Sequence, residues 1–191
     1  MVSVPNFYHK IDKSVRIAIC VPVRDNVTAA FSYSLAMLLK KCGETNLKTS
    51  LHYNIGSEVA MQRQQLVEEA LETNPTHILW LDSDMKFPSD ILQRLLHHNK
   101  DVVACNYSTR AEPLYPVAFT SDGDLEQRLY AKKGTSSVFA VGLGCMLVNT
   151  NVFKDMQTPY FSVQWNEDYT NLVGEDIYLS LIHISEPTRL G

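Results

Sequence analysis

Two carboxylates, Asp82 and Asp84, follow directly on the largely apolar run 77–81. A run of this kind is typical of a strand that is buried on both faces. Ionised carboxylates are too costly to bury unpaired, so either a cation meets the pair or the pair faces solvent. Hard oxygen donors suit magnesium and manganese, and the pair therefore predicts a divalent metal that carries a phosphate-rich ligand. A solvated strand end is the alternative interpretation.

The chain contains a second copy of the Asp-x-Asp pattern, at Asp122 and Asp124. This copy lies in a polar run that is typical of a hairpin turn, and we expect no function for it. The first copy instead follows a buried strand and precedes a helix that Pro88 opens. Because ligands of open α/β sheets bind at the carboxyl ends of the strands, the context favours a functional role for Asp82 and Asp84.

Composition is that of one ordinary globular domain, with 191 residues, 45% of them hydrophobic and 20% charged. The net charge of -4 and the pI of about 5.8 argue against a basic nucleic-acid footprint, although DNA as a substrate stays open. The four cysteines form no C-x-x-C motif, which favours reduced core thiols over a zinc site. No signal peptide or membrane-spanning run is recognisable, so we expect a soluble, cytoplasmic protein.

Strand and helix patterns alternate over the first hundred residues. Apolar runs predict strands at 15–23, 48–53, 77–81 and 101–106. Apolar residues at helical spacing predict helices at 28–41, from Gly56-Ser57 to about 72, and at 88–98, with Cys42-Gly43 ending the first. The alternation predicts an α/β fold built on a doubly wound, mostly parallel sheet.

The rhythm changes after Asn106, where prolines and glycines interrupt the chain. Short antiparallel strands are expected at 117–119, 129–130 and 138–141, followed by a return to the core at 142–148 and a short helix at 149–156. The second half is therefore expected to be a small, irregular antiparallel addition that covers the strand ends.

Several separated segments carry further polar or glycine residues of interest. They are Pro22 to Asp25, Arg63-Gln64, Tyr107 to Arg110, Gly142 to Leu147, and Gly174 to Tyr178. Together with Asp82-Ser83-Asp84, in this order and spacing, they resemble the nucleotide-sugar-dependent glycosyltransferases of the GT-A fold. The resemblance is to the small family-2-like enzymes of bacteriophages in particular, and it spans residues 15 to 178.

The resemblance implies a UDP-sugar donor and a bound Mn²⁺ or Mg²⁺ ion. Asp84 would be the direct metal ligand, and Asp82 would contact the ribose or a metal-bound water. Arg63 and Arg110 would contact the diphosphate, although a solvated helix face is an equal alternative for Arg63. The residues expected around the donor are Pro22, Val23, Arg24, Asp25, Arg63, Asp82, Ser83, Asp84, Arg110, Gly142 and Gly144.

The resemblance also implies the catalytic residues. Asp176, with Glu175 beside it, would be the general base that takes a proton from the acceptor hydroxyl in an inverting displacement. Acidic residues in the first turn of a helix, which complement the helix dipole, are the structural alternative. Gly142 and Gly144 would let the backbone approach the sugar or the acceptor closely, or would simply form a tight strand turn. The acceptor, whether glycan, protein or modified DNA base, is not indicated.

The terminal run 179–189 departs from this resemblance and is similar to a translated sequencing-library adaptor. We therefore expect one glycosyltransferase domain at 1–178 that is truncated at its C-terminus, and a foreign tail at 179–191. Such a sequence would be environmental and viral in origin. Related enzymes continue with a histidine that completes the metal shell, and His183 is not expected to replace it. Weak metal binding and slow turnover follow from this expectation.

Two other functions are compatible with the acid pair. A nucleotidyltransferase also uses a doubly wound sheet and a carboxylate-held metal, but it would carry a glycine-rich basic loop where this chain has Arg24-Asp25-Asn26. A non-catalytic nucleotide-sugar-binding fragment would bind the donor without turnover. The sequence favours the metal-dependent glycosyltransferase.

Overall fold

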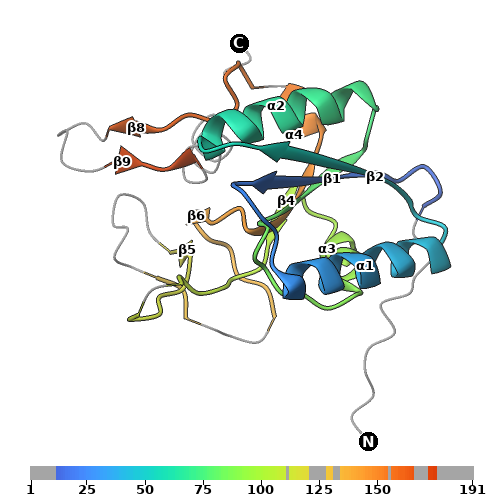
Figure 1. The fold of residues 1–191 in the computed structure, drawn as a ribbon, viewed down its shortest axis with the longest axis horizontal. Helices are drawn as coiled ribbons and strands as arrows, with labels where there is room; N and C mark the ends of the chain where they lie inside the picture. Colours follow the sequence, from blue (N-terminus) through green and yellow to red (C-terminus); the bar gives the residue numbers. More distant parts are fainter. Residues whose placement is uncertain are drawn as a thin grey trace, which may run out of the picture.

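The computed structural model describes residues 12–110, 112–120, 128–130, 134–154, 156–165 and 172–175. Its centre is a five-stranded sheet in the order β2-β1-β3-β7-β4 (Figure 1). The strands of this sheet are β1 (Arg16–Val23), β2 (Lys48–Ile55), β3 (His77–Leu81), β4 (Val102–Ala104) and β7 (Cys145–Asn149). β1 pairs in parallel with β2 and β3, whereas β7 lies antiparallel between β3 and β4. The α/β class and the mostly parallel sheet are confirmed.

Helices cover both faces of this sheet, as a doubly wound fold requires (Figure 1). They are α1 (Ala29–Glu44), α2 (Val59–Glu72), α3 (Ile91–His97) and α4 (Asn151–Lys154). The apolar sides of α1 and α3 form one core cluster with Leu79 and Leu81, and those of α2 and α4 form a second with Ile78 and Trp80. Successive residues of β3 thus point into opposite cores.

The burial of β3 on both faces confirms the prediction for this strand. Ile78, Leu79, Trp80 and Leu81 are each at most 1% exposed. A strand this apolar needs cover on both sides, and its first polar residue comes where the cover ends. This is why Asp82 emerges at the edge of the sheet.

The predicted helix boundaries are partly wrong. Thr28 caps α1 by accepting a hydrogen bond from the Phe31 amide at 3.1 Å, as expected, but the helix continues through Gly43 to Glu44. Gly43 lies inside α1, and Thr45 is the C-cap: its backbone amide donates to the Lys41 and Gly43 carbonyls. α2 begins at Val59 after Glu58, so the predicted Gly56-Ser57 cap is wrong, and α3 is shorter at both ends than predicted.

The second half of the chain contains less regular structure than the sequence predicts. Strands β5 (Ala118–Phe119) and β6 (Ala140–Val141) pair with each other, as do β8 (Gln164–Trp165) and β9 (Leu172–Val173). The strand expected at 129–130 is reduced to an amide of Leu129 that donates to the Ala118 carbonyl, and the expected 149–156 helix to α4. The return to the core is confirmed by β7. No helix among the described residues is both long and apolar enough to cross a bilayer.

Candidate functional site

Asp82 and Asp84 lie at the carboxyl end of β3, where neighbouring backbone fixes the turn that carries them. The Asp82 amide donates to the Gly144 carbonyl at 3.0 Å, and the Ser83 carbonyl accepts from the Thr28 amide at 3.1 Å. The Met85 amide closes the turn on the Asp82 carbonyl at 3.0 Å. The two side chains keep 26% and 27% of their surface exposed, so both carboxylates can reach a ligand from solvent.

Arg63 on α2 holds two carboxylates at once. Its Nη2 lies 3.0 Å from Asp82 Oδ1, and its Nη1 lies 2.6 Å from Glu175 Oε1. The arginine side chain is only 5% exposed and that of Glu175 only 13%. The alternative of a solvated helix face is therefore wrong for Arg63. The contacts join α2, the end of β3 and the Gly174-Glu175 segment through one buried cation.

Asp84 pairs with a different arginine. Arg110 Nε contacts Asp84 Oδ2, and the Arg110 side chain is 80% exposed. The structure thus brings together five of the predicted residues: Arg63, Asp82, Asp84, Arg110 and Glu175. Each member of the acid pair has a cationic partner, but Arg63 is buried and shared with Glu175, whereas Arg110 is exposed to solvent.

Gly142 and Gly144 lie against Tyr107, a residue for which the sequence indicated no separate role. The Gly144 amide donates to the Tyr107 hydroxyl at 2.8 Å. A Cβ atom placed on Gly144 would lie 2.5 Å from that hydroxyl oxygen and 2.9 Å from Asp82 Oδ2, and one on Gly142 would lie 2.6 Å from the hydroxyl. Both glycines are therefore required by a close approach to Tyr107. The sequence places Tyr107 after β4, but it does not show that Tyr107 contacts the glycines that precede the neighbouring strand β7.

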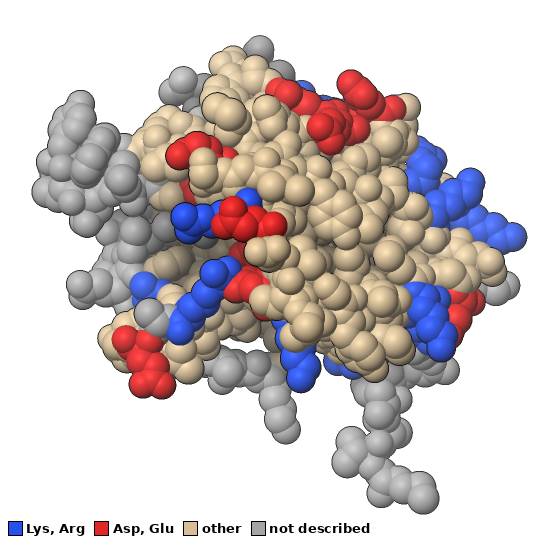
Figure 2. Space-filling view, in the orientation of Figure 1, with Lys and Arg blue, Asp and Glu red and all other residues tan. Residues whose placement is uncertain are grey.

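The segment after β1 contributes less to this cluster than the sequence analysis implied. Pro22 and Val23 are buried within β1, and the Val23 carbonyl accepts hydrogen bonds from the Gly56 amide at 3.0 Å and from Gln62 Nε2 at 2.7 Å. Arg24 and Asp25 are exposed and pair with each other at 3.7 Å. They follow β1 at the carboxyl edge of the sheet, so their predicted contacts with the donor stay predictions. Figure 2 shows acidic and basic side chains intermixed on the side toward which β1 and β2 point.

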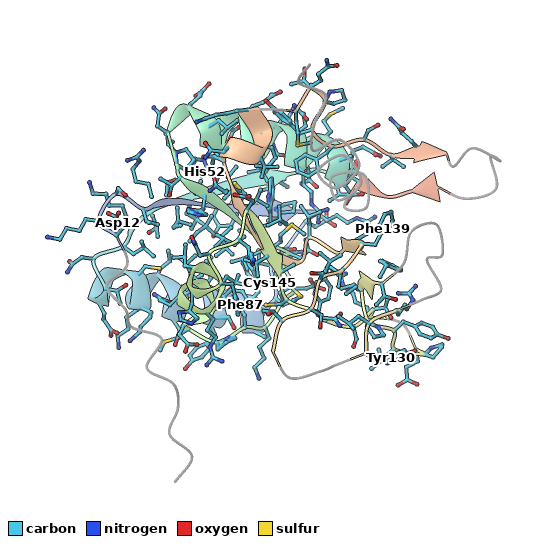
Figure 3. The ribbon with its side chains drawn as sticks, turned by 180° about the vertical axis from the view of Figure 1, so that it is seen from behind. Asp12, His52, Phe87, Tyr130, Phe139 and Cys145 are labelled. Carbon is cyan, nitrogen blue, oxygen red and sulfur yellow. The ribbon has the colours of Figure 1, made fainter. Side chains whose placement is uncertain are left out.

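Two cysteines lie behind the acid pair. The Cys105 amide donates to the Cys145 carbonyl at 2.9 Å. Cys145 is buried in one core cluster with Phe87 (Figure 3), and the half-buried Cys105 packs against that cluster. The hydrogen bond between the two thiols and burial raise the pKa of Cys145, and the nearby charge of Asp82 adds to this. The same hydrogen bond lowers the pKa of Cys105.

The donor set at this edge fits a metal that is shared with a phosphate ligand. Within the described ranges, no three His, Cys, Asp or Glu side chains gather as a metal site. Magnesium in nucleotide-binding proteins is commonly held by one or two carboxylates together with substrate phosphates and water. Asp82 and Asp84 supply that number. Asp176, His183, Asp122 and Asp124 lie outside the described residues, so their predicted roles stay predictions.

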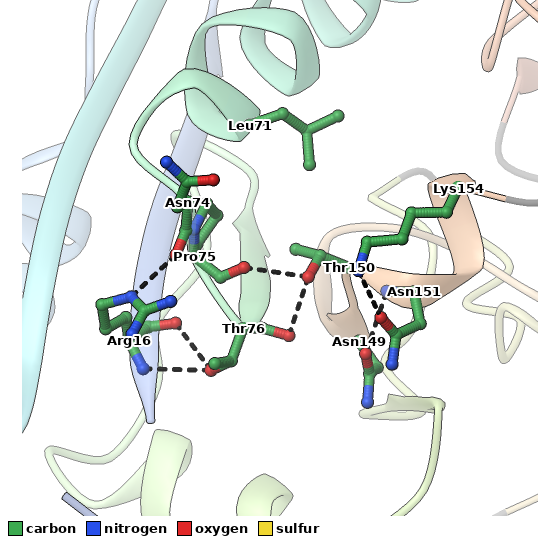
Figure 4. Close-up of a pocket in the computed structure, with 9 residues that line it drawn as sticks. All are labelled: Arg16, Leu71, Asn74, Pro75, Thr76, Asn149, Thr150, Asn151 and Lys154. Carbon is green, nitrogen blue, oxygen red and sulfur yellow. Dashed lines mark hydrogen bonds between the residues drawn. The ribbon is translucent and has the colours of Figure 1, made fainter. Parts of the chain in front are cut away.

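A cavity of about 540 Å³ opens at the opposite edge of the sheet (Figure 4). It is lined by residues at the amino ends of β1 and β3, including Arg16 and Thr76, and by Asn149, Thr150 and Lys154 near the end of β7. The sheet separates this cavity from Asp82 and Asp84. Its lining therefore contributes nothing to the candidate site.

Comparisons with known proteins find sequence similarity over part of the chain. The model of the Anp1 family matches residues 48–114, a range that includes β2, α2, β3, the acid pair and Arg110. A mannan polymerase complex subunit, mnn9 of Schizosaccharomyces pombe, is 30% identical over 89 residues, which are 44% of this chain and 26% of that protein. The chain thus spans about a quarter of this relative. In sequence it is similar to an Anp1/Mnn9-like glycosyltransferase domain.

One solved structure shares the fold over most of this chain, and a second gives a weaker match. The A197 protein from STIV superposes with a TM-score of 0.59 at 17% identity, covering 88% of this chain and 78% of that one. A glycosyltransferase involved in glycosylation of the major capsid of PBCV-1 gives a TM-score of 0.39 at 14% identity, with 75% and 68% covered. The chain is an α/β protein with a mixed sheet of parallel core strands and antiparallel additions, and its fold is similar to that of A197.

Proposed function

We propose that this protein is a metal-dependent glycosyltransferase that moves a sugar from a UDP-sugar to a hydroxyl group of a glycan. The observation that carries the proposal is the pair Asp82 and Asp84 at the carboxyl end of a buried parallel strand, with an arginine on each carboxylate. The pair lies inside the range that matches the Anp1 family. A carboxylate pair beside an exposed arginine suits a metal–diphosphate ligand.

The residues at this edge have three proposed roles: metal binding, positioning and contact with the donor. Asp84, which is part-exposed, and Asp82 would hold the divalent cation, which when bound neutralises charge on the departing diphosphate. Arg63, buried on α2, holds Asp82 and Glu175 in place through its two ion pairs. Arg110 and the exposed Arg24 offer charge-assisted hydrogen bonds to the donor.

Proton transfer is assigned to the segment that Arg63 anchors. Asp176 follows Glu175 directly in the chain, and we propose it as the base that accepts the proton of the acceptor hydroxyl in an inverting displacement. Glu175 is held by Arg63 at 2.6 Å with its side chain 13% exposed, so we give it a positioning role. Of the two neighbouring acids, Glu175 therefore positions the segment and Asp176 takes part in the reaction.

The sugar and acceptor are proposed from the sequence relative. Because the mnn9 subunit is named for mannan polymerase, we propose a mannosyl group as the first sugar to test and a mannose-terminated oligosaccharide as the acceptor. The mixed charge around the acid pair suits a donor with a diphosphate better than a neutral substrate.

A product assay distinguishes this function from its two rivals. The protein is incubated with UDP- and GDP-sugars, with manganese or with excess chelator, in the presence and absence of the oligosaccharide. A glycosyltransferase releases nucleoside diphosphate and extends the acceptor only with metal. A parallel incubation contains UTP and a sugar phosphate in place of the nucleotide sugar, and pyrophosphate release there would instead identify a nucleotidyltransferase. Donor binding without any product would identify a non-catalytic fragment.

A further inference from the structure

The two arginines on the acid pair differ in how firmly they are held. Arg63 contacts Asp82 and Glu175, and its side chain is 5% exposed. Among the described residues, Arg110 pairs with Asp84 alone, and its side chain is 80% exposed. Breaking a buried pair leaves an uncompensated charge, whereas an exposed ion pair exchanges readily with water and ions. Only the Arg110 contact is easily given up.

The backbone around Arg110 limits how far this side chain can move. The Thr109 amide donates to the Tyr115 carbonyl at 2.8 Å, and the Tyr115 amide returns a hydrogen bond to Thr109 Oγ1 at 3.0 Å. Ser108 and Pro116 form a bridge next to them. These bonds fix the backbone that precedes Arg110, next to Asp84. The long Arg110 side chain can therefore change partner without a change in the fold.

Asp84 is also the carboxylate proposed to hold the metal, and a guanidinium and a divalent cation on the same carboxylate repel each other. We propose that Arg110 is a resident counterion of Asp84, which it releases when a divalent cation binds, and that its guanidinium then contacts the phosphates of the nucleotide. The phosphate half of this inference rests on the proposed function, and the metal half does not.

This exchange predicts that removing Arg110 changes the metal affinity and the nucleotide affinity in opposite directions. Without nucleotide, Arg110 competes with the cation, so removing it strengthens metal binding. With nucleotide, Arg110 is a phosphate ligand, so removing it weakens nucleotide binding. A side chain with only a structural role would not shift the two affinities in opposite directions.

The test uses calorimetry on the nucleotide-free protein titrated with Mn²⁺, and on the Mn²⁺-saturated protein titrated with UDP. Four proteins are compared: wild type, Arg110→Gln, Lys86→Gln and Asp84→Asn. Lys86 is exposed and two residues from Asp84, so its substitution removes the same charge nearby without breaking the ion pair. Asp84→Asn establishes that the measured Mn²⁺ site is the one at Asp84.

We expect Arg110→Gln to bind Mn²⁺ about three-fold more tightly than wild type, with a smaller gain at high salt. Lys86→Gln should show less of this gain, and Asp84→Asn should lose Mn²⁺ binding. With saturating Mn²⁺, Arg110→Gln should bind UDP about five-fold more weakly. Mn²⁺ binding seen only in Arg110→Gln would also support the assignment.

Equal or weaker Mn²⁺ binding by Arg110→Gln overturns the inference, as does an equal gain in Lys86→Gln. Unchanged UDP affinity in Arg110→Gln overturns its phosphate half. Failure of the wild type to bind UDP at all, with the Mn²⁺ difference intact, contradicts the proposed function while supporting Arg110 as the counterion of Asp84. The two failures are therefore distinguishable.

Discussion

Arg63 Nη1 lies 2.6 Å from Glu175 Oε1 although 112 positions separate the two residues in the chain. The second nitrogen of the same guanidinium lies 3.0 Å from Asp82. One side chain from α2 thus connects the proposed metal edge to the segment that precedes the proposed base. The geometry makes Arg63 a positioning residue and removes it from the group of direct diphosphate ligands that the sequence implied.

Arg63→Met should destabilise the protein by about 3 kcal/mol, because the largely buried Glu175 and the part-exposed Asp82 both lose their buried cation. The free energy of unfolding in urea measures this. Arg24→Met is the matched control, since Arg24 pairs on the surface and should cost no more than about 1 kcal/mol. Equal losses in the two variants would refute the role of Arg63.

Gly144→Ala should lower the free energy of unfolding, whereas Gly43→Ala should raise it. A Cβ on Gly144 would meet Tyr107 at 2.5 Å and Asp82 at 2.9 Å, and we expect a loss of about 1–3 kcal/mol. Gly43 lies within α1 with nothing within 4 Å, so alanine there should add about 0.5–1 kcal/mol. Urea unfolding compares them, and Tyr107→Ala should relieve part of the Gly144→Ala defect. A neutral Gly144→Ala would show that this contact is not tight.

Asp176→Asn should leave UDP binding unchanged and abolish sugar transfer, because an amide cannot accept the acceptor's proton. Calorimetry and the product assay separate the two effects. Asp124→Asn, in the second Asp-x-Asp copy, is the control and should change neither. Substantial transfer by Asp176→Asn would indicate a retaining mechanism or a different base.

Alkylation should select Cys105 among the four cysteines. Its pKa is lowered by the hydrogen bond from Cys145, whereas burial raises that of Cys42 to about 11 and raises that of Cys20 further. A lower pKa gives more thiolate at a given pH, so labelling of Cys105 should rise with pH before that of Cys42. Mass spectrometry after iodoacetamide treatment at a series of pH values measures this. Cys145→Ala should shift the Cys105 profile to higher pH, and labelling of Cys42 ahead of Cys105 would contradict the assignment.

The sequence predicted the elements whose pattern is local and strong. The run that forms β3 is apolar at every buried position, and the acids that follow it can only emerge at the sheet edge. Helix ends were predicted less well, because a glycine such as Gly43 lies in the helix interior when the next cap, at Thr45, satisfies the carbonyls. Weak strands such as the one expected at 129–130 depend on long-range pairing that a local pattern does not contain.

The site was predicted as a set of residues but not as a set of contacts. Arg63, Asp82, Asp84, Arg110 and Glu175 were all named, and the structure brings them together. Which arginine meets which carboxylate depends on packing between α2, β3 and the loop after β4, and residue types do not encode it. Tyr107 was missed as a separate site residue for the same reason. The relation to family-2-like bacteriophage enzymes stays a prediction beside the similarity to the Anp1 family.

UDP binding by wild type, Asp84→Asn and Asp122→Asn, measured by calorimetry with Mn²⁺ and with excess chelator, tests the central claim most directly. The account predicts that wild type and Asp122→Asn bind UDP equally and only with metal, and that Asp84→Asn loses more than about ten-fold in affinity. Equal UDP affinity in chelator, or identical behaviour of the two variants, would contradict a metal–diphosphate site at the end of β3.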